Sequence, residues 1–131
     1  MRPDRISFFD LASQRLAWLS ESQRVVSENV ANADTPGFRA QTTSEFSEML
    51  STSRMSGLAV TDARHIQGNS ATGPVRTMDD PDAWASTLDG NSVVLEQQAI
   101  RASELSGGYQ LAATLYRKGH DFLRLSVSGN Q

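Results

Sequence analysis

The sequence predicts a mainly α-helical protein, in which two long antiparallel helices near the two ends of the chain form a coiled-coil-like domain. Two observations support the helices: apolar residues recur at heptad spacing near the N-terminus and again near the C-terminus. The third observation is a middle stretch rich in Ser, Thr, Gly, Asp and Pro, which predicts a loop-rich, partly extended segment. We therefore expect residues 1–38 and 88–131 to form one helical domain and residues 39–87 to form the middle segment.

The first predicted helix covers residues 5–33. A heptad row of eight positions, seven of them apolar, indicates that it packs lengthwise on another helix. The row consists of Phe9, Ala12, Leu16, Leu19, Gln23, Val26, Val30 and Ala33. Such a helix is about 40 Å long at the usual rise per residue.

A strong stop signal follows this helix. Thr35 precedes a proline and is therefore driven towards extended backbone, while Pro36 and Gly37 suit the central positions of a tight turn. Upstream, Asn29 and Asn32 are three residues apart. They therefore share a helix face, from which their amides can bond the returning chain.

The middle segment carries weaker patterns. Residues 44–50 are compatible with a short helix capped by Ser44, and residues 51–82 predict loop or disorder. A small extended hairpin is an open alternative in that stretch. The only apolar anchors expected there are Leu58, Val60 and Ile66.

The second predicted helix starts near residues 89–92, with Asn91 or Ser92 as its N-cap, and runs to about Val127. Every seventh residue from Leu88 is apolar, and a second row contains small residues that permit close helix approach. These rows consist of Leu88, Leu95, Ala102, Tyr109, Tyr116 and Leu123, and of Leu105, Ala112 and Gly119.

Beyond Gln110 the second helix becomes apolar over much of its circumference. A further row adds Leu111, Leu115, Phe122 and Leu125. One antiparallel partner covers only a single stripe of a helix, so the excess apolar surface implies burial against more than one neighbour. A glycine pair at residues 107–108 precedes this part and predicts a bend.

Composition excludes several function classes. The chain has 131 residues, 38% of them hydrophobic, a net charge of −3 and no cysteine. These values predict one domain with a thin core and exclude disulfides and thiolate chemistry. No basic face favours nucleic acid or an anionic membrane, and no stretch reaches the ~18 apolar residues that span a bilayer. The N-terminus lacks the apolar stretch of a secretory signal peptide, so we expect a soluble protein that does not use the general secretory route.

No set of side chains predicts catalysis, a cofactor site or a metal site. His65 and His120 are isolated histidines without a defined carboxylate partner. Asp79, Asp80 and Asp82 lack the spacing of a calcium loop and predict a solvated acidic turn. The sequence contains neither a nucleophile elbow nor a phosphate-binding loop.

The predicted packing positions lie on the apolar rows of both helices. They are Leu16, Leu19, Val26, Val30, Leu95, Tyr109, Leu115, Tyr116, Phe122 and Leu123. Trp18 and Trp84 fit two readings equally well, as interface anchors or as ordinary packing against the other helix. A soluble helical adaptor or chaperone-like module that uses the same rows is a rival hypothesis, and an enzyme is the weakest one.

The segment covering residues 27–40 resembles the N-terminal signature of flagellar axial proteins, which comprise rod, hook and hook-associated subunits. That signature is an apolar helix that ends in Asn-x-x-Asn-x-x-Thr-Pro-Gly-aromatic. Its defining positions here are Asn29, Asn32, Thr35, Pro36, Gly37 and Phe38. The short chain, residues 58–66 and residues 89–96 are similar to proximal rod proteins of the FlgB type. The paralogous FlgC type is the nearest alternative.

The resemblance implies a structural subunit of the flagellar basal body and not an enzyme. Its terminal helices are expected to pack with other copies and other rod proteins into a hollow tubular rod that crosses the periplasm and transmits torque. The implied neighbours are the adaptor FliE, the membrane-ring protein FliF and the flagellar type III export gate. The resemblance also implies export through the type III apparatus without cleavage of a signal peptide.

Overall fold

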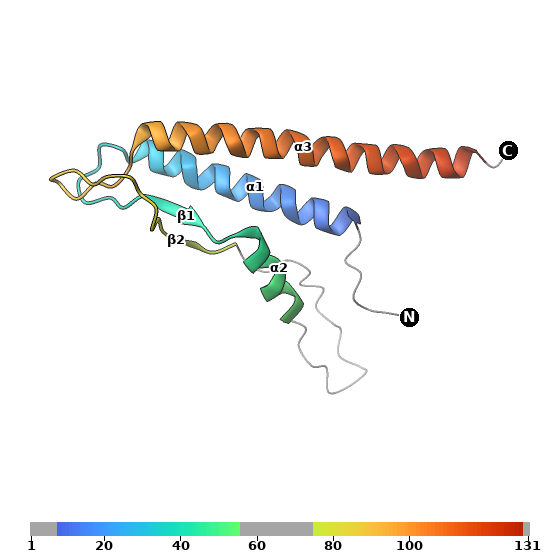
Figure 1. Cartoon of the computed structure of the whole chain (residues 1–131), viewed down its shortest axis with the longest axis horizontal. Helices are drawn as coiled ribbons and strands as arrows, with labels where there is room; N and C mark the ends of the chain where they lie inside the picture. Colours follow the sequence, from blue (N-terminus) through green and yellow to red (C-terminus); the bar gives the residue numbers. More distant parts are fainter. Residues whose placement is uncertain (1–7, 56–74, 130–131) are drawn as a thin grey trace.

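The computed structural model describes residues 8–55 and 75–129, so the predictions for Leu58, Val60, His65 and Ile66 lie outside the described residues. Along the chain the elements are α1 (Phe8–Ala31), β1 (Gln41–Thr43), α2 (Phe46–Met55), β2 (Thr77–Asp79) and α3 (Leu95–Ser128). One long helix lies near each end, and the middle part combines loops, a short helix and two short strands (Figure 1). This arrangement confirms the predicted fold class.

α1 and α3 lie side by side and run in opposite directions (Figure 1). Their 24 and 34 residues correspond to lengths of about 36 Å and 51 Å. α3 therefore extends past the first residue of α1. Phe8 lies beside Gly119 and Phe9 lies against His120, so α3 beyond His120 extends past the start of α1 in the described part of the chain.

The buried face of α1 rotates along the helix. Leu19, Val25 and Val26 are buried, whereas Val30 is 48% exposed. A straight α-helix has about 3.6 residues per turn and drifts away from a strict seven-residue repeat. The predicted heptad row therefore holds at Leu19 and Val26 and fails at Val30 within the subunit, because Asn29 occupies the buried face there.

The two strands join the ends of the middle segment beside α1. β1 and β2 pair antiparallel with Gln41 opposite Asp79, although many residues separate them in sequence (Figure 1). Loop was predicted for residues 51–82. In the described part of that stretch, α2 continues to Met55 and β2 forms an edge strand.

Trp18 fixes the start of α2 on α1. Its Nε1 donates to the backbone oxygen of Ser44 at 2.7 Å, and its ring centroid lies 6.1 Å from that of Phe46. The guanidinium of Arg15 covers both rings. The prediction that Ser44 caps this helix is wrong, because α2 starts at Phe46 and Glu45 directly precedes it. The Oγ of Ser44 instead accepts the backbone N–H of Arg76 at 3.3 Å.

α3 begins later than the sequence predicts. Its first residue is Leu95, and Val94 at the N-cap position makes no side-chain capping bond. The prediction of Asn91 or Ser92 as N-cap is wrong, because both side chains bond other parts of the chain. α3 then continues as one α-helix through its glycine pair and ends at Ser128.

Candidate assembly surface and the chain reversal

The chain reverses direction between α1 and α3 through a compact set of turns, which we call the reversal. It comprises residues 32–40 and 80–94 together with the helix ends that they join. Gly37 and Gly90 both have positive φ, at 74° and 85°, and lie against each other. The backbone N–H of Gly37 donates to the carbonyl of Asp89 at 2.9 Å. Glycine suits both positions because it adopts positive φ without strain.

Asn29 is the buried centre of the reversal and has no exposed surface. Its Nδ2 donates to the backbone oxygen of Gln41 at 2.8 Å and to Oε1 of Gln98 at 3.0 Å. Its Oδ1 accepts the backbone N–H of Gln41 at 2.8 Å. One amide thus holds β1 and α3 on α1, so the first asparagine of the signature bonds the returning chain.

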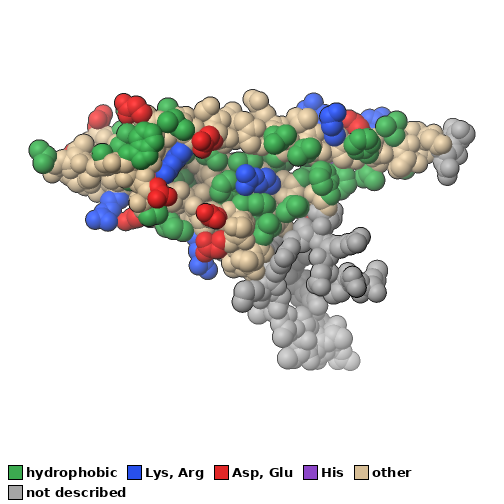
Figure 2. Space-filling model, viewed as in Figure 1, with side chains coloured by type: hydrophobic (Ala, Val, Ile, Leu, Met, Phe, Trp, Pro, Cys, Tyr) green, Lys and Arg blue, Asp and Glu red, His purple; other side chains and the backbone are tan. Residues whose placement is uncertain are grey.

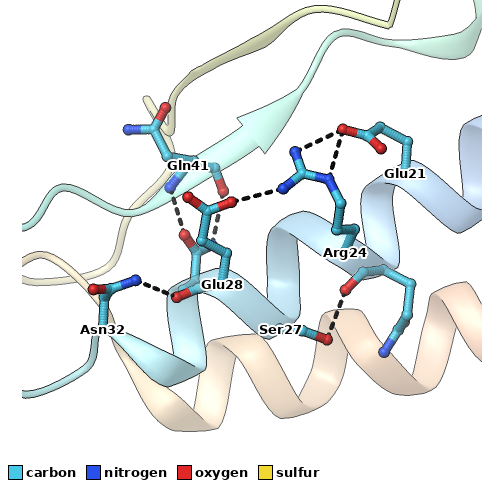
Figure 3. A network of polar contacts seen from close by, with 8 residues as sticks. Glu21, Arg24, Ser27, Glu28, Asn32 and Gln41 are labelled. Atoms are coloured by element: carbon cyan, nitrogen blue, oxygen red, sulfur yellow. Dashed lines mark hydrogen bonds and ion pairs between the residues drawn. The ribbon is translucent and has the colours of Figure 1, made fainter.

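Asn32, the second asparagine of the signature, bonds locally. Its Nδ2 donates to the backbone oxygen of Glu28 at 2.9 Å (Figure 3), and its Oδ1 accepts from Thr35 at 3.2 Å. Both bonds are exposed to solvent. They close the end of α1, which stops at Ala31, two residues before the predicted end.

Asn91 joins the two sides of the reversal from the α3 side. Its buried Nδ2 donates to the backbone oxygens of Asn32 at 2.9 Å and Thr35 at 2.8 Å. Its Oδ1 accepts the backbone N–H of Val93 at 2.8 Å. Two carbonyls of the turn that follows α1 therefore find a donor in the segment that precedes α3.

Ser92 completes this connection. Its Oγ accepts the backbone N–H of Ala40 at 2.8 Å, and its backbone N–H donates to the carbonyl of Phe38 at 3.0 Å. Phe38 is half-buried beside this contact. The residues predicted to cap the second helix thus hold the first turn instead.

An ion pair ties β2 to α3. Asp80 lies 2.6 Å from Arg101, and its side chain is only 2% exposed. The prediction of a solvated acidic turn is therefore wrong for Asp80. It fits Asp79, which is exposed and pairs with Arg39 at 3.5 Å. Within residues 8–55 and 75–129, no group of three or more histidine and acidic side chains is placed to hold a metal ion.

The charged face of α1 carries a local network (Figure 3). Arg24 lies between Glu21 and Glu28, at 2.7 Å and 2.9 Å from their carboxylates. The hydrogen bond from Arg24 lowers the pKa of Glu21 below its ordinary value, and the same network raises the pKa of Arg24. In the reversal, the hydroxyl of Thr87 lowers the pKa of Asp89 in the same way. These shifts stabilise charged surface groups and create no general acid or base.

Aromatic rings close the far end of the helix pair. Phe9 packs edge-on against Tyr116 at 5.6 Å and lies 4.5 Å from the ring of His120. Gly119 makes room for this cluster, because an added Cβ there would lie 2.8 Å from the ring of Phe8. His120 thus contacts two aromatic rings, those of Phe9 and Tyr116, while it stays exposed to solvent.

The C-terminal part of α3 and the Gly129 that caps it, residues 109–129, form the distal arm. Its row of Leu111, Leu115, Phe122 and Leu125 is between 47% and 70% exposed, and we call it the distal row. Figure 2 shows hydrophobic side chains near this end of the rod-shaped molecule. No helix that the structure describes is long and apolar enough to cross a membrane. The distal row is therefore apolar surface on a helix that the subunit itself leaves uncovered within the described residues.

Some of the other predicted packing positions are buried between α1 and α3, and the rest are exposed. Leu19 and Val26 are buried, and Leu16 and Tyr116 are half-buried, with Tyr116 packed against Phe9 of α1. The exposed positions are Val30, Leu95, Tyr109, Leu115, Phe122 and Leu123. Val25 and Gln98 are also buried, on α1 and α3, although the heptad pattern does not include them. A period of 3.6 residues predicts burial of Val25. Trp84 and Leu88 lie exposed in the loop before α3, so Leu88 does not continue the helical row.

Comparison with known proteins identifies the chain. Residues 9–39 match the family described as flagella basal body rod protein. The flagellar basal body rod protein FlgB of Agrobacterium fabrum is 33% identical to the chain, and the match covers 93% of each protein. The chain belongs to the FlgB family of flagellar basal body rod proteins. The FlgB proteins of Yersinia enterocolitica and Escherichia coli are 32% and 28% identical, over 73% and 71% of this chain and 75% and 72% of their own lengths.

Family membership settles the class of function. A FlgB-family chain is a structural subunit of the rod in the flagellar basal body and is not an enzyme. It assembles with other rod proteins. The FlgC alternative is not supported, because the relatives named above are FlgB proteins. The matched residues 9–39 cover α1 from its second residue and the signature turn, which form the N-terminal side of the reversal.

Proposed function

We propose that this FlgB-family subunit forms part of a hollow tubular shaft at the base of the rod, which transmits torque across the periplasm. In this proposal, residues 1–38 and 88–131 act as one helical domain, and its helices pack lengthwise on those of neighbouring subunits. Buried helix–helix contacts resist shear because packed interiors are dense and poorly compressible.

The distal row carries this proposal. An apolar row repeated at heptad spacing packs most favourably against another helix. Within the subunit, α1 occupies a different face of α3, where Ala112 is buried and Gly108 faces Leu19. The exposed row therefore offers a second helix-packing face, as a subunit surrounded by neighbours requires.

The reversal supports the same proposal from the other end. Asn29 and Asn91 fix α1 and α3 in one relative position through buried hydrogen bonds. A pair of helices held in this way moves as a unit and passes load from one to the other. We propose that the exposed positions Val30, Leu95, Tyr109, Phe122 and Leu123 contact neighbours in the assembled rod.

We further propose that the subunit contacts the adaptor FliE and the ring protein FliF, and that it passes the flagellar type III export gate without cleavage of a signal peptide. The family relationship supports these partners, because they are the expected neighbours of a proximal rod subunit. Cross-linking in intact basal bodies from engineered cysteines at the exposed positions tests each contact separately.

Motility provides the test of the proposed function. A strain without this gene is complemented with Phe122→Asp, Leu123→Asp or the control Ser103→Asp, which lies exposed earlier on α3. We expect the first two variants to abolish swimming and the control to swim. Mass spectrometry of purified basal bodies should find the control subunit and not the other two.

Full motility of Phe122→Asp and Leu123→Asp would contradict the proposal. Purification of the wild-type chain as a discrete soluble complex with one partner, together with its absence from basal bodies, would favour the adaptor hypothesis instead.

A further inference from the structure

Charge is distributed unevenly along the molecule. The distal arm contains three basic residues and one acidic residue, a net charge of +2. Residues 8–55 and 75–108 contain six arginines and twelve acidic residues, a net charge of −6. The arm is thus basic and apolar, while the rest of the described chain is acidic. Figure 2 shows basic side chains near the C-terminal end of α3.

The distal row is apolar and the arm that carries it is basic, so an apolar surface bordered by acidic side chains would complement it. Leu111, Leu115, Phe122 and Leu125 are spaced with Lys118 at the remaining position of the repeat. A long lysine side chain can keep its charge at the rim of an apolar contact while its methylene groups pack. Two distal rows facing each other would bring two basic arms together, and like charges in an interface are unfavourable.

The subunit contains a groove with matching chemistry. It has a volume of about 240 Å³ and lies between α1, β1 and the first half of α3. Its apolar wall includes Trp18, Val25 and Leu105, and Glu45 and Glu104 also line it. Arg101 lines it as well, but its charge is paired with Asp80 at 2.6 Å. Both glutamates are exposed, so they are available to a basic partner.

We propose that the distal arm of one copy docks into this groove of a second copy, with its basic side chains facing the acidic rim. The inference rests on the proposed function and specifies which face meets which. Because the two surfaces differ, the contact is head-to-tail and leaves a free arm and a free groove at the two ends of every chain of subunits. Such heterologous contacts propagate and do not close into a symmetric dimer.

A charge-exchange experiment tests this contact with the full-length protein. One variant, Lys118→Glu with Arg124→Glu, reverses the sign of these charges on the arm. Another, Glu45→Lys with Glu104→Lys, reverses the sign of the charges that border the groove. All four positions are exposed, and circular dichroism checks that both variants keep the helical fold. Sedimentation velocity then measures self-association at low and high salt.

We expect the wild type to associate at low salt and each variant alone to associate on the order of tenfold more weakly. Mixing the two variants should restore association, since the acidic arm of one now fits the basic groove of the other. The difference between wild type and variants should shrink at high salt, where charges are screened.

Three results would overturn the inference. Association of either variant alone at wild-type strength would exclude the charged contact, and failure of the mixture to associate would exclude the arm–groove pairing. Absence of wild-type association, with binding to anionic lipid vesicles through the arm, would assign the arm to a membrane surface. Detection of the chain in basal bodies tests the proposed function independently of these outcomes.

Discussion

The two ends of the helix pair are built on different physical principles. The reversal is polar, and its central side chains, Asn29 and Asn91, are buried with each amide bonded to backbone. The distal arm is apolar, and its row is largely exposed. Buried polar hydrogen bonds are thus concentrated at one end, and uncovered apolar surface at the other.

This difference separates folding from assembly. Buried amide hydrogen bonds fix one geometry, because a displaced partner would leave polar groups unpaired in the interior. Exposed apolar surface contributes little to the isolated subunit and gains free energy only when a neighbour covers it. Substitutions in the reversal should therefore change unfolding, whereas substitutions in the distal row should change assembly.

The largest effect on stability is expected at Asn29. Asn29→Ala leaves both backbone groups of Gln41 and the side chain of Gln98 without their buried partner. We expect a loss of about 3 kcal/mol in the free energy of unfolding, measured by urea denaturation followed by circular dichroism.

Asn32→Ala is the matched control, because Asn32 belongs to the same signature but its side chain makes only exposed bonds. We expect a loss of about 0.5 kcal/mol for this variant. Equal losses of unfolding free energy for Asn29→Ala and Asn32→Ala would show that burial of a side-chain amide in the reversal does not determine its contribution to stability.

The next effect concerns the α3 side of the reversal. Asn91→Asp keeps an oxygen that can accept from Val93 but places a carboxylate against the carbonyls of Asn32 and Thr35. We expect a loss of about 2 kcal/mol, measured as for Asn29. A wild-type unfolding curve for Asn91→Asp at neutral pH would show that these two bonds do not hold the reversal.

Two alanine substitutions, at Gly107 and at Gly119, compare an open position with a closely packed position on α3. At Gly107 an added Cβ meets nothing within 4 Å, so Gly107→Ala should stabilise the helix by about 1 kcal/mol. At Gly119 the added Cβ would lie 2.8 Å from the ring of Phe8 and 3.1 Å from that of Phe9. The gain in helix propensity is then offset by displaced rings, and thermal unfolding should place Gly119→Ala at least about 1 kcal/mol below Gly107→Ala. Equal stabilisation by both alanines would contradict close packing at the aromatic cluster.

The smallest effect is the pH dependence at Glu21. Its pKa is lowered by Arg24, so the pair contributes stability above the ordinary carboxyl pKa and loses it as the pH falls through the lowered value. Glu21→Gln should cost only a few tenths of a kcal/mol at neutral pH, because the pair is on the surface. Urea denaturation should show this difference disappear in strong acid. A difference that persisted there would assign the effect to something other than charge.

The sequence supports the two helices because their apolar periodicity is long and regular. It also supports the turn at residues 35–37, where proline fixes its own φ and glycine permits the positive φ that Gly37 adopts. A strict heptad does not predict that the buried face of α1 moves from Val30 towards Val25 and Asn29, because α1 is also contacted by β1. Periodicity along the sequence predicts each helix, but it does not predict which other elements pack on the helix and so determine its buried face.

The misassigned cap has a similar cause. Asn91 and Ser92 have the residue types of an N-cap, but their side chains reach the carbonyls and N–H groups of the first turn, which is distant in sequence. The buried pair of Asp80 and Arg101 likewise joins residues whose proximity depends on the tertiary fold. The exposed distal row, in contrast, was predictable, because its excess over one stripe is visible in the sequence alone.

The most direct test compares the exposure of the distal row before and after assembly. The chain contains no cysteine, so Phe122→Cys introduces a single thiol into the distal row. The account predicts rapid maleimide labelling of this thiol in the free subunit and strong protection in intact basal bodies from a strain that still swims. Equal labelling in the two states would show that the row stays open in the rod and would contradict the account.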